Sequence, residues 1–471
     1  MKSKTMVGVV ILGALLGVGL WLLMAGRDLG VTGAPAAPPD RGVSVPVVPP
    51  VPVAEPHQHE EQQDISAPGA TAESVPEAPP ASAETVTEQP MLDPLTSDEI
   101  PRDNGAHFFV LATELFPDVD MGRLMEKWAE ARANDFRADA ELRMMLERFR
   151  LAFEAFERGL EVGNIRMPAP RAVNDPMPYL TRFRDLGQVM AIEAELRAAA
   201  GNINGAFENY SILLRFSAQT VHGGSLLHTM VSASLQDMGT QSLRRVLDWK
   251  PASSEQYRYM VSGLKAAEEA MPGISTILLN EAQRYEILFE QARREGKTVK
   301  ELIVGATGAS DLFAEMSDEE LEERMSAVLS DYQEVAQLFE KPYSEVRAVD
   351  LSALLGDHPL SEDQEQTLER LHTQYFLNRA QVRGTCAMAA VEWYGAENDV
   401  YPKAIGDLVP KYLAEEPMDP FTDAPFGYGL TDAGYFLYSA GPDMIDDGCT
   451  DGPWHQPGSD VVFRSMEGQV L

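Results

Sequence analysis

The residues with the clearest capacity for chemistry are oxygen-bearing side chains near the C-terminus. Six of them lie within 22 residues: Ser439, Asp443, Asp446, Asp447, Asp451 and Asp460. Carboxylates and hydroxyls are hard ligands of the kind Ca²⁺ prefers, and the glycines among them allow tight turns that direct carbonyl oxygens inward. We predict a calcium site with Asp443, Asp447, Asp460 and Ser439 as ligands. The spacing is not that of an EF-hand, and the alternative is an exposed, turn-rich loop that binds no metal.

The rest of the chain offers little for catalysis. His222 and His228 are six residues apart, on opposite faces of a helix, and there is no G-x-S-x-G, H-E-x-x-H or P-loop pattern. The net charge of −35 argues against nucleic acid as a partner, because such binding needs a cationic surface. We therefore predict a protein that is not an enzyme and does not bind nucleic acid.

The acidic segment must be positioned by the elements around it, which we assign to a C-terminal domain over 346–471. A long helix is expected from near Ser361 to Tyr401-Pro402, because apolar residues recur at steps of three and four. Strand-like runs follow at 426–428, 435–438 and 461–463. A small sheet needs a cover for its apolar face. We expect the helix to cover it with one stripe: Leu368, Leu371, Tyr375, Val382, Cys386, Ala389 and Trp393.

The order of short segments in this region resembles the globular domain of the major pseudopilin of type II secretion, over about 371–463. The matching segments are Tyr401-Pro402, Leu408-Val409-Pro410-Lys411-Tyr412-Leu413, Asp419-Pro420-Phe421-Thr422, Tyr435-Phe436-Leu437-Tyr438-Ser439-Ala440-Gly441-Pro442-Asp443, Asp447-Gly448 and Asp460-Val461-Val462-Phe463. The resemblance implies an α+β domain whose Asp/Gly loop binds calcium. Two departures argue against assembly by the family's route: no Phe-Thr-Leu-Leu-Glu-like motif precedes Val7, and the apolar N-terminal segment lies more than 300 residues from the long helix.

The resemblance also bears on the two cysteines. It implies that the loop containing Cys449 runs close to the helix containing Cys386, and an exported domain meets an oxidising compartment. A disulfide between them is therefore one prediction. The alternative is that Cys386 is a small buried apolar residue and Cys449 occupies a turn, because free cysteine is commonly buried.

Upstream, residues 101–345 have helical periodicity almost throughout, and we predict an α-helical bundle or irregular solenoid. Ser317 with Glu320 forms a capping-box pair that predicts a helix start. Gly201, Ala206, Tyr210 and Leu214 have the offsets of a tetratricopeptide-like (TPR-like) helix pair. That pattern does not recur at a fixed period, so an ordinary antiparallel helix pair remains the alternative.

The N-terminal hundred residues contain two segments of different composition. Residues 5–26 form an uncharged apolar run long enough to span a bilayer, within a predicted anchor over 1–26, and Lys2 and Lys4 place the N-terminus in the cytoplasm. A cleaved signal peptide is the alternative. Residues 27–100 are rich in proline and acidic residues and predict a disordered stalk.

The predicted fold is therefore mainly α, with an anchor, a stalk, a helical domain and a pseudopilin-like α+β module. We expect a single-pass inner-membrane protein with its body in the periplasm and a binding or scaffolding function near a type II secretion-like system. The competing hypothesis is a periplasmic adaptor that binds through a TPR-like helical domain, with the C-terminal module purely structural. The sequence does not identify the protein partner.

Overall fold

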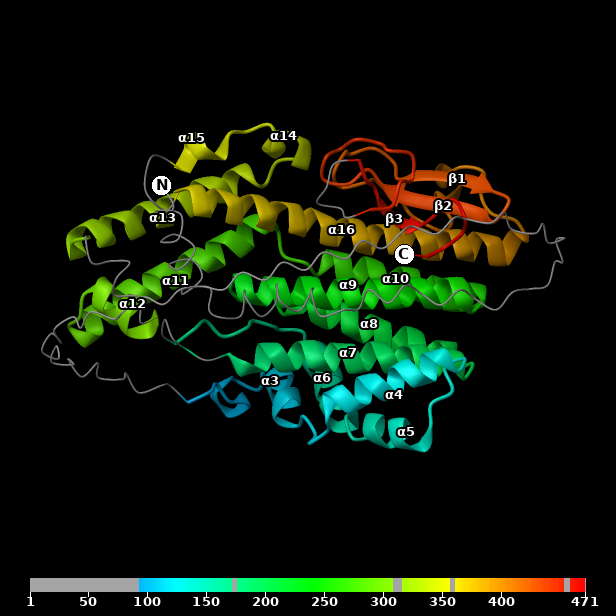
Figure 1. Cartoon of the computed structure of the whole chain (residues 1–471), viewed down its shortest axis with the longest axis horizontal. Coiled ribbons are helices and arrows are strands. Elements are labelled where there is room, and N and C mark those ends of the chain that lie inside the picture. Colours follow the sequence, from blue (N-terminus) through cyan, green and yellow to red (C-terminus); the bar gives the residue numbers. More distant parts are fainter. Residues whose placement is uncertain are drawn as a thin grey trace, which may run out of the picture. The chain divides into compact units, whose positions relative to one another are not determined.

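A computed structural model describes residues 93–171, 175, 177–307, 316–355, 361–452 and 458–470 (Figure 1). The predicted anchor at 1–26, including the apolar run at 5–26, lies outside these residues, as does the predicted stalk at 27–100 except for its last eight positions. Across the described part, no helix is both long enough and apolar enough to cross a membrane. The prediction of a mainly helical chain with a small antiparallel sheet is confirmed.

The first group of helices surrounds a core of aromatic rings. Its elements are η1 (Ser97–Glu99), α3 (Ala106–Glu114), α4 (Met121–Ala133), α5 (Ala140–Glu147) and α6 (Arg150–Val162). The ring of Phe216, from a later helix, stacks on Phe156 with centroids 4.1 Å apart and meets Phe109 edge-on at 4.8 Å. All three rings are fully buried, so this core ties the first helices to the next group.

The central bundle is a ring of four helices with a fifth helix packed on its outside. The ring consists of α8 (Ile203–Gln219), α9 (Leu226–Trp249), α10 (Ser254–Glu269) and α16 (Ser361–Asn398), and the fifth helix is α7 (Pro178–Ala199). Packing runs from α8 to α9, to α16, to α10 and back to α8, while α7 lies against α8 and α9. The helix pair proposed as TPR-like is α7 with α8, joined through Gly201 at φ +82°. This helix pair is part of a bundle whose last member, α16, is distant in the sequence.

Between α10 and α16, the described residues form five helices. These are α11 (Ile274–Glu295), α12 (Val299–Thr307), α13 (Asp318–Leu338), α14 (Tyr343–Arg347) and α15 (Leu351–Leu355). The Ser317 side chain accepts a hydrogen bond from the Glu320 amide at 3.1 Å, so the predicted start of α13 is confirmed. Helices α11 and α13 pack on each other, and α15 contacts α16.

The sheet has three antiparallel strands in the order β1 (Gly427–Thr431), β2 (Gly434–Ser439) and β3 (Val461–Arg464). A bulge interrupts the β2–β3 pairing between Leu437 and Tyr438. The short helix η3 (Ile405–Leu408) lies on α16 before β1. Helix α16 covers the sheet where the Phe463 ring lies against Gly384, so closely that a Cβ at Gly384 would approach it to 2.2 Å. Glycine is therefore needed there for the close approach of helix and sheet.

The stripe predicted to cover the sheet faces the bundle at Cys386. Cys386 lies on that stripe, and its Sγ approaches the Val261 carbonyl of α10. Gly384, two residues away on the opposite side of the helix, faces the sheet instead. Sequence periodicity identified a helix but could not show that two of its sides are covered. Both sides are apolar because α16 belongs to the bundle and to the sheet module together.

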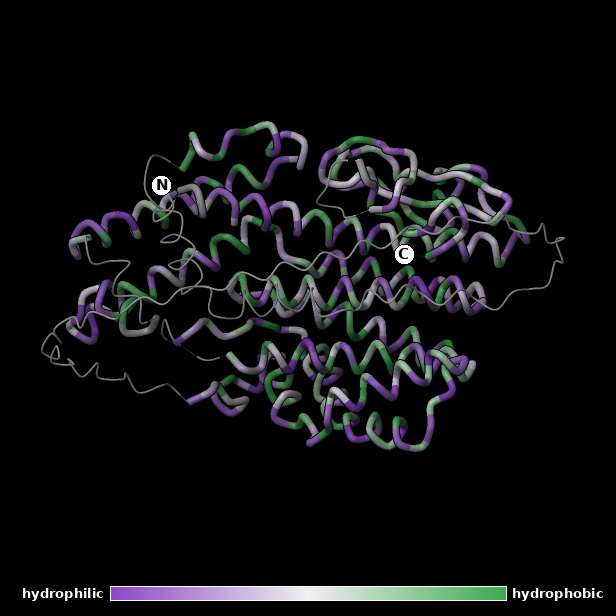
Figure 2. Tube along the Cα trace, viewed as in Figure 1, coloured by the Kyte–Doolittle hydropathy of each residue, from purple (hydrophilic) through white to green (hydrophobic). Residues whose placement is uncertain are grey.

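One apolar core consequently crosses the predicted domain boundary at 345/346. A single cluster of buried residues runs from Ala194 in α7 to Phe463 in β3. The bundle and the sheet module lie in the same compact unit. Figure 2 shows hydrophobic residues interleaved with hydrophilic ones along the helices. The C-terminal module is thus a part of the helical body, and its helix is a structural member of both.

Candidate functional site

The acidic loop, residues 440–460 between β2 and β3, brings two of the predicted metal ligands together. The Asp447 amide donates a hydrogen bond to Asp460 Oδ1 at 3.3 Å, and the Thr450 amide donates to Asp460 Oδ2 at 2.9 Å. Burial raises the pKa of the Asp460 carboxyl, and the charges of Asp446 and Asp447 raise it further. Clustered carboxylates of this kind favour a cation, because each raises the cost of ionising the others.

Asp447 supplies the observation that bears most directly on an ion. Its Oδ2 is buried and has no hydrogen-bond partner among the described residues. A buried carboxylate oxygen without a donor is costly, whereas a bound cation would satisfy it. This unpartnered oxygen is compatible with a cation, whereas both oxygens of Asp460 already accept backbone hydrogen bonds. The described residues contain no group of three or more His, Cys, Asp or Glu side chains arranged to hold a metal.

Two other predicted ligands have different surroundings. Asp443 Oδ1 accepts from the Ile445 amide at 3.1 Å and Oδ2 from the Gly458 amide at 3.3 Å, so Asp443 joins the two ends of the acidic loop. Ser439 Oγ donates to Asp419 Oδ1 at 2.9 Å and accepts from the Gly441 amide. Ser439 thus anchors the start of the loop to a buried carboxylate, and the structure does not direct it toward Asp447.

Asp419 was not singled out as a site residue, although it begins one of the pseudopilin-like segments. It is 2% exposed and also accepts hydrogen bonds from the amides of Phe421 and Ala440. Burial raises the pKa of its carboxyl, and these hydrogen bonds oppose the shift. Its role is to hold the segment before β1 against the end of β2.

The disulfide predicted between Cys386 and Cys449 is not formed. Both cysteines are free and buried. Cys386 faces α10, whereas Cys449 packs with Tyr438 and Val462 in a separate cluster. Val462 is next to Phe463, whose ring faces α16, so the Cys449 cluster lies on the other side of the sheet. The resemblance suggested that loop and helix are close, but the sheet lies between the two sulfur atoms.

A second group of polar residues lies where α16, the sheet and α9 meet; we call it the junction cluster: Glu392, Tyr401, Tyr435, Arg464 and Asp248. Tyr435 donates to Glu392 Oε1 at 2.8 Å, and Tyr401 donates to Glu392 Oε2 at 3.5 Å. Burial raises the pKa of Glu392 to about 7, while the tyrosine hydrogen bonds and Arg464 oppose the shift. Glu392 therefore changes charge near neutral pH.

Arg464 connects the two ends of the junction cluster. Its guanidinium forms an ion pair with Asp248 at the end of α9 and lies over the Tyr435 ring, 5.0 Å from the centroid. Arg464 Nε is buried without a hydrogen-bond partner in the described structure. The cluster thus joins β3 to the helical body by an ion pair between a buried arginine and a carboxylate that is partly exposed.

Arg244 forms a second buried connection between α9 and α16. It is 1% exposed, and its Nη1 donates to Gln381 Oε1 at 2.7 Å and to Thr385 Oγ1 at 3.1 Å. Its guanidinium carbon also lies 5.5 Å from the centroid of the Phe463 ring. Burial lowers the pKa of Arg244 to about 10. One side chain of α9 therefore reaches both the helix and a strand of the C-terminal module.

The histidines considered for catalysis have structural surroundings. His228 is fully buried; its Nδ1 accepts from the Ser225 amide at 3.1 Å, which caps α9, and its Nε2 lies 3.1 Å from the Tyr179 hydroxyl. His222 Nε2 lies 2.7 Å from the Ala270 carbonyl oxygen. Both rings connect helix ends.

Sequence reasoning missed the junction cluster, although one signal was present. Glu392 is the only charged residue between Arg383 and Glu397 in an otherwise apolar helix segment. A lone carboxylate in such a segment predicts a buried polar contact. Nothing in the sequence indicated Arg244 or Arg464, because their partners lie more than a hundred residues away.

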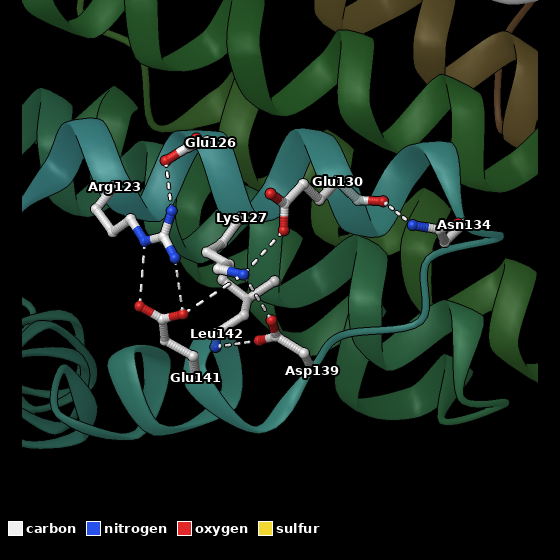
Figure 3. A network of polar contacts seen from close by, with 8 residues as sticks. All are labelled: Arg123, Glu126, Lys127, Glu130, Asn134, Asp139, Glu141 and Leu142. Atoms are coloured by element: carbon white, nitrogen blue, oxygen red, sulfur yellow. Dashed lines mark hydrogen bonds and ion pairs between the residues drawn. The ribbon is translucent and has the colours of Figure 1, made fainter.

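A third charged group connects α4 with α5 at the surface (Figure 3), and we call it the hairpin network. Arg123 forms a bidentate ion pair with Glu141, and both of its hydrogen bonds are 3.1 Å long. Lys127 Nζ donates a hydrogen bond to Asp139 Oδ2 at 2.9 Å. Asp139 also caps α5 by accepting from the Leu142 amide at 2.8 Å. The lysine ammonium and the amide hydrogen bond lower the pKa of Asp139, the amide contributing most.

Comparisons with known proteins add no relative. No protein-family model matches the chain, and neither a curated protein nor a solved structure shows significant similarity to it.

Proposed function

We propose that this chain is a membrane-anchored component of the cell envelope that binds or scaffolds other proteins, associated with a type II secretion-like system. The apolar run at 5–26 and the proline-rich, acidic stalk at 27–100 support a body held away from the inner membrane on its periplasmic side. The pseudopilin-like segments over 371–463 support the link to secretion.

The observation that carries the proposal is the shared helix α16. It is buried against α10 on one side and against the sheet on the other, so bundle and module form one body. A single body of this kind suits a scaffold, because a contact made on the sheet is held rigidly to the bundle.

Calcium binding in the acidic loop is the second part of the proposal. Asp447 and Asp460 would hold the ion, while Asp443 would connect the two ends of the loop by hydrogen bonds. The positive charge of the ion would offset the repulsion between these carboxylates. The unpartnered Asp447 Oδ2 is the supporting observation.

Calcium should raise the melting temperature of the full chain. The free energy of unfolding should increase by RT ln(1 + [L]/Kd), which is about 2.7 kcal/mol when calcium is in hundredfold excess over its Kd. Millimolar calcium is suitable, because extracellular sites bind calcium with a Kd of about 10⁻⁴–10⁻³ M. Asp447→Asn should abolish the gain. The matched control is Asp423→Asn, which removes an exposed carboxylate outside the acidic loop. Equal melting with calcium and with a chelator would contradict the calcium site.

A second candidate follows from the same helix. Because α16 completes the bundle, the module also supports the alternative of a periplasmic adaptor that binds through its helical domain, with the sheet only structural. Cross-linking of a partner to the full chain separates the two: contacts within 365–471 favour the module, and contacts within 103–345 favour the bundle.

A further inference from the structure

Strand β1 is an open edge of the sheet. In the order β1-β2-β3, the outer strands are β1 and β3. The β3 edge is partly occupied, because Arg464 at its end pairs with Val470, and Asp460 just before it pairs with Asp451. No such pairing involves the outer side of β1 among the described residues.

The register determines those groups. Thr431 and Gly434 close a two-residue turn, so they form a hydrogen-bonded pair, and pairs alternate from there along the strand. The N–H and C=O groups of Tyr428 and Leu430 consequently point away from β2. They have no hydrogen-bond partner within the described structure. At the strand's start, the Phe426 amide donates to the Pro417 carbonyl, so the open stretch begins after that residue.

The edge lacks the features that normally prevent strand pairing. Exposed edges are usually protected by proline, lysine or a bulge. The sequence Gly427–Thr431 contains no proline and no charge, and its pairing with β2 has no register shift. Rings of Tyr438 and Phe436 lie against Gly427 and Gly429, close enough that a Cβ there would approach them to 2.2 and 2.6 Å. One face of β1 is thus covered by its own sheet while the edge stays available.

The surroundings of the edge are acidic. Asp423 precedes β1, Asp432 forms the turn after it, and both are exposed. Asp407 is also exposed and close enough for its charge to act on the Tyr428 phenol. Lys403, four residues before Asp407 in the segment between α16 and β1, is an exposed cation. A second copy of the chain would bring the same carboxylates together, and each copy has a net charge of −35, so charge favours a basic occupant.

We propose that the β1 edge binds an extended, positively charged segment of a partner protein by strand addition. The backbone groups of Tyr428 and Leu430 would supply the hydrogen bonds, and Asp423, Asp432 and Asp407 would select the charge. The inference rests on the proposed binding function and names the kind of partner. It does not depend on calcium or on membrane topology.

The test measures binding of labelled synthetic peptides to the full chain by fluorescence anisotropy. The probe is the capped heptapeptide Lys-Thr-Val-Thr-Val-Thr-Lys, compared with the acidic Glu-Thr-Val-Thr-Val-Thr-Glu and with Lys-Thr-Pro-Thr-Pro-Thr-Lys, which cannot pair as a strand. We expect the first to bind at least about tenfold more tightly than the others. Higher salt should weaken it, because the selection is electrostatic.

Two variants locate the binding. Leu430→Pro removes the outward N–H, which an edge strand tolerates, and Leu430→Lys keeps the backbone but adds a repelling charge. Both should abolish binding with little change in melting temperature. The control is Leu279→Lys on α11, where a leucine is 44% exposed, against 49% for Leu430.

Binding that survives both Leu430 variants would overturn the proposal, as would equal binding of all three peptides or none. Concentration-dependent dimerisation that Leu430→Lys abolishes would identify a second copy as the occupant and equally overturn it. Neither a missing calcium effect nor a different topology would change these readouts, so failure here is distinguishable from failure of the calcium or anchor proposals.

Discussion

The hairpin network between α4 and α5 and the charged residues around α16 differ in how deeply their arginine side chains are buried. In the hairpin network, Glu141 and Asp139 are 42% and 47% exposed as they pair with Arg123 at 40% and with Lys127 at 12%. Around α16, Arg244 is 1% exposed, and Arg464 at 9% pairs with Asp248 at 36%. Both groups join segments that are separate in the chain.

The energetic consequences differ because water reaches the charges of the hairpin network but not the fully buried Arg244. Exposed ion pairs are screened by solvent and salt, and they lose side-chain entropy on forming. Buried charged groups have already lost their hydration, so removing one partner leaves the other unsatisfied. The hairpin network therefore fixes the orientation of α4 and α5 weakly, whereas the contacts of α16 hold the bundle to the sheet. Burial, more than the number of charges, decides which contacts matter.

The largest effect is expected for Arg244. Arg244→Ala would leave a cavity and remove the donor to Gln381 Oε1, and should lower the free energy of unfolding by about 3 kcal/mol or more. Arg244→Met should cost less, because it fills the space. Chemical denaturation measures both, with Arg258→Ala at an exposed site as control. If Arg244→Ala costs no more than the control, the buried contact is not what joins α9 to α16.

An intermediate, pH-dependent effect is expected for Glu392. Its pKa is raised to about 7 in the folded chain, above the value of 4.5 for an exposed glutamate, so the folded state holds a proton that the unfolded state has released. The stability from this group is complete below about pH 4.5 and is lost as pH rises through about 7. The loss is on the order of 3 kcal/mol at most.

Glu392→Gln should remove this pH dependence. The variant keeps an acceptor for Tyr435 and has no charge to bury, so it should be more stable than the native chain at pH 8 and similar at pH 4. Thermal melts across this range provide the measurement. A native-like decline with pH in the variant would mean that another group causes it.

The smallest effect is expected in the hairpin network. Lys127→Met keeps the aliphatic stem and removes the ammonium that contacts Asp139, so a slight decrease in melting temperature at low salt is expected. It should disappear near 1 M salt, where the Debye length is about 3 Å. Arg158→Met, which loses an ion pair with Glu161 within one helix, is the control. A large decrease in the melting temperature of Lys127→Met that does not depend on salt would contradict the contrast between exposed and buried charges.

The sequence by itself determined the local structure. Helical periodicity and the capping residue Ser317 predicted helices, and short runs of aromatic and β-branched residues predicted the three strands, because both signals depend on neighbours within a few residues. It also placed Asp443, Asp447 and Asp460 in one loop, since their separation in the chain is short. Of these, the structure brings Asp447 and Asp460 together most directly.

Only the tertiary structure decided which surfaces meet. The stripe containing Cys386 faces α10 because α16 completes a bundle whose other helices lie more than ninety residues earlier. The same arrangement separates the two cysteines by a sheet and turns Ser439 toward Asp419. It also buries Glu392 between two tyrosines and so raises its pKa. An amphipathic pattern specifies that a face is buried, but the choice of neighbour depends on contacts between distant segments, which local spacing does not encode.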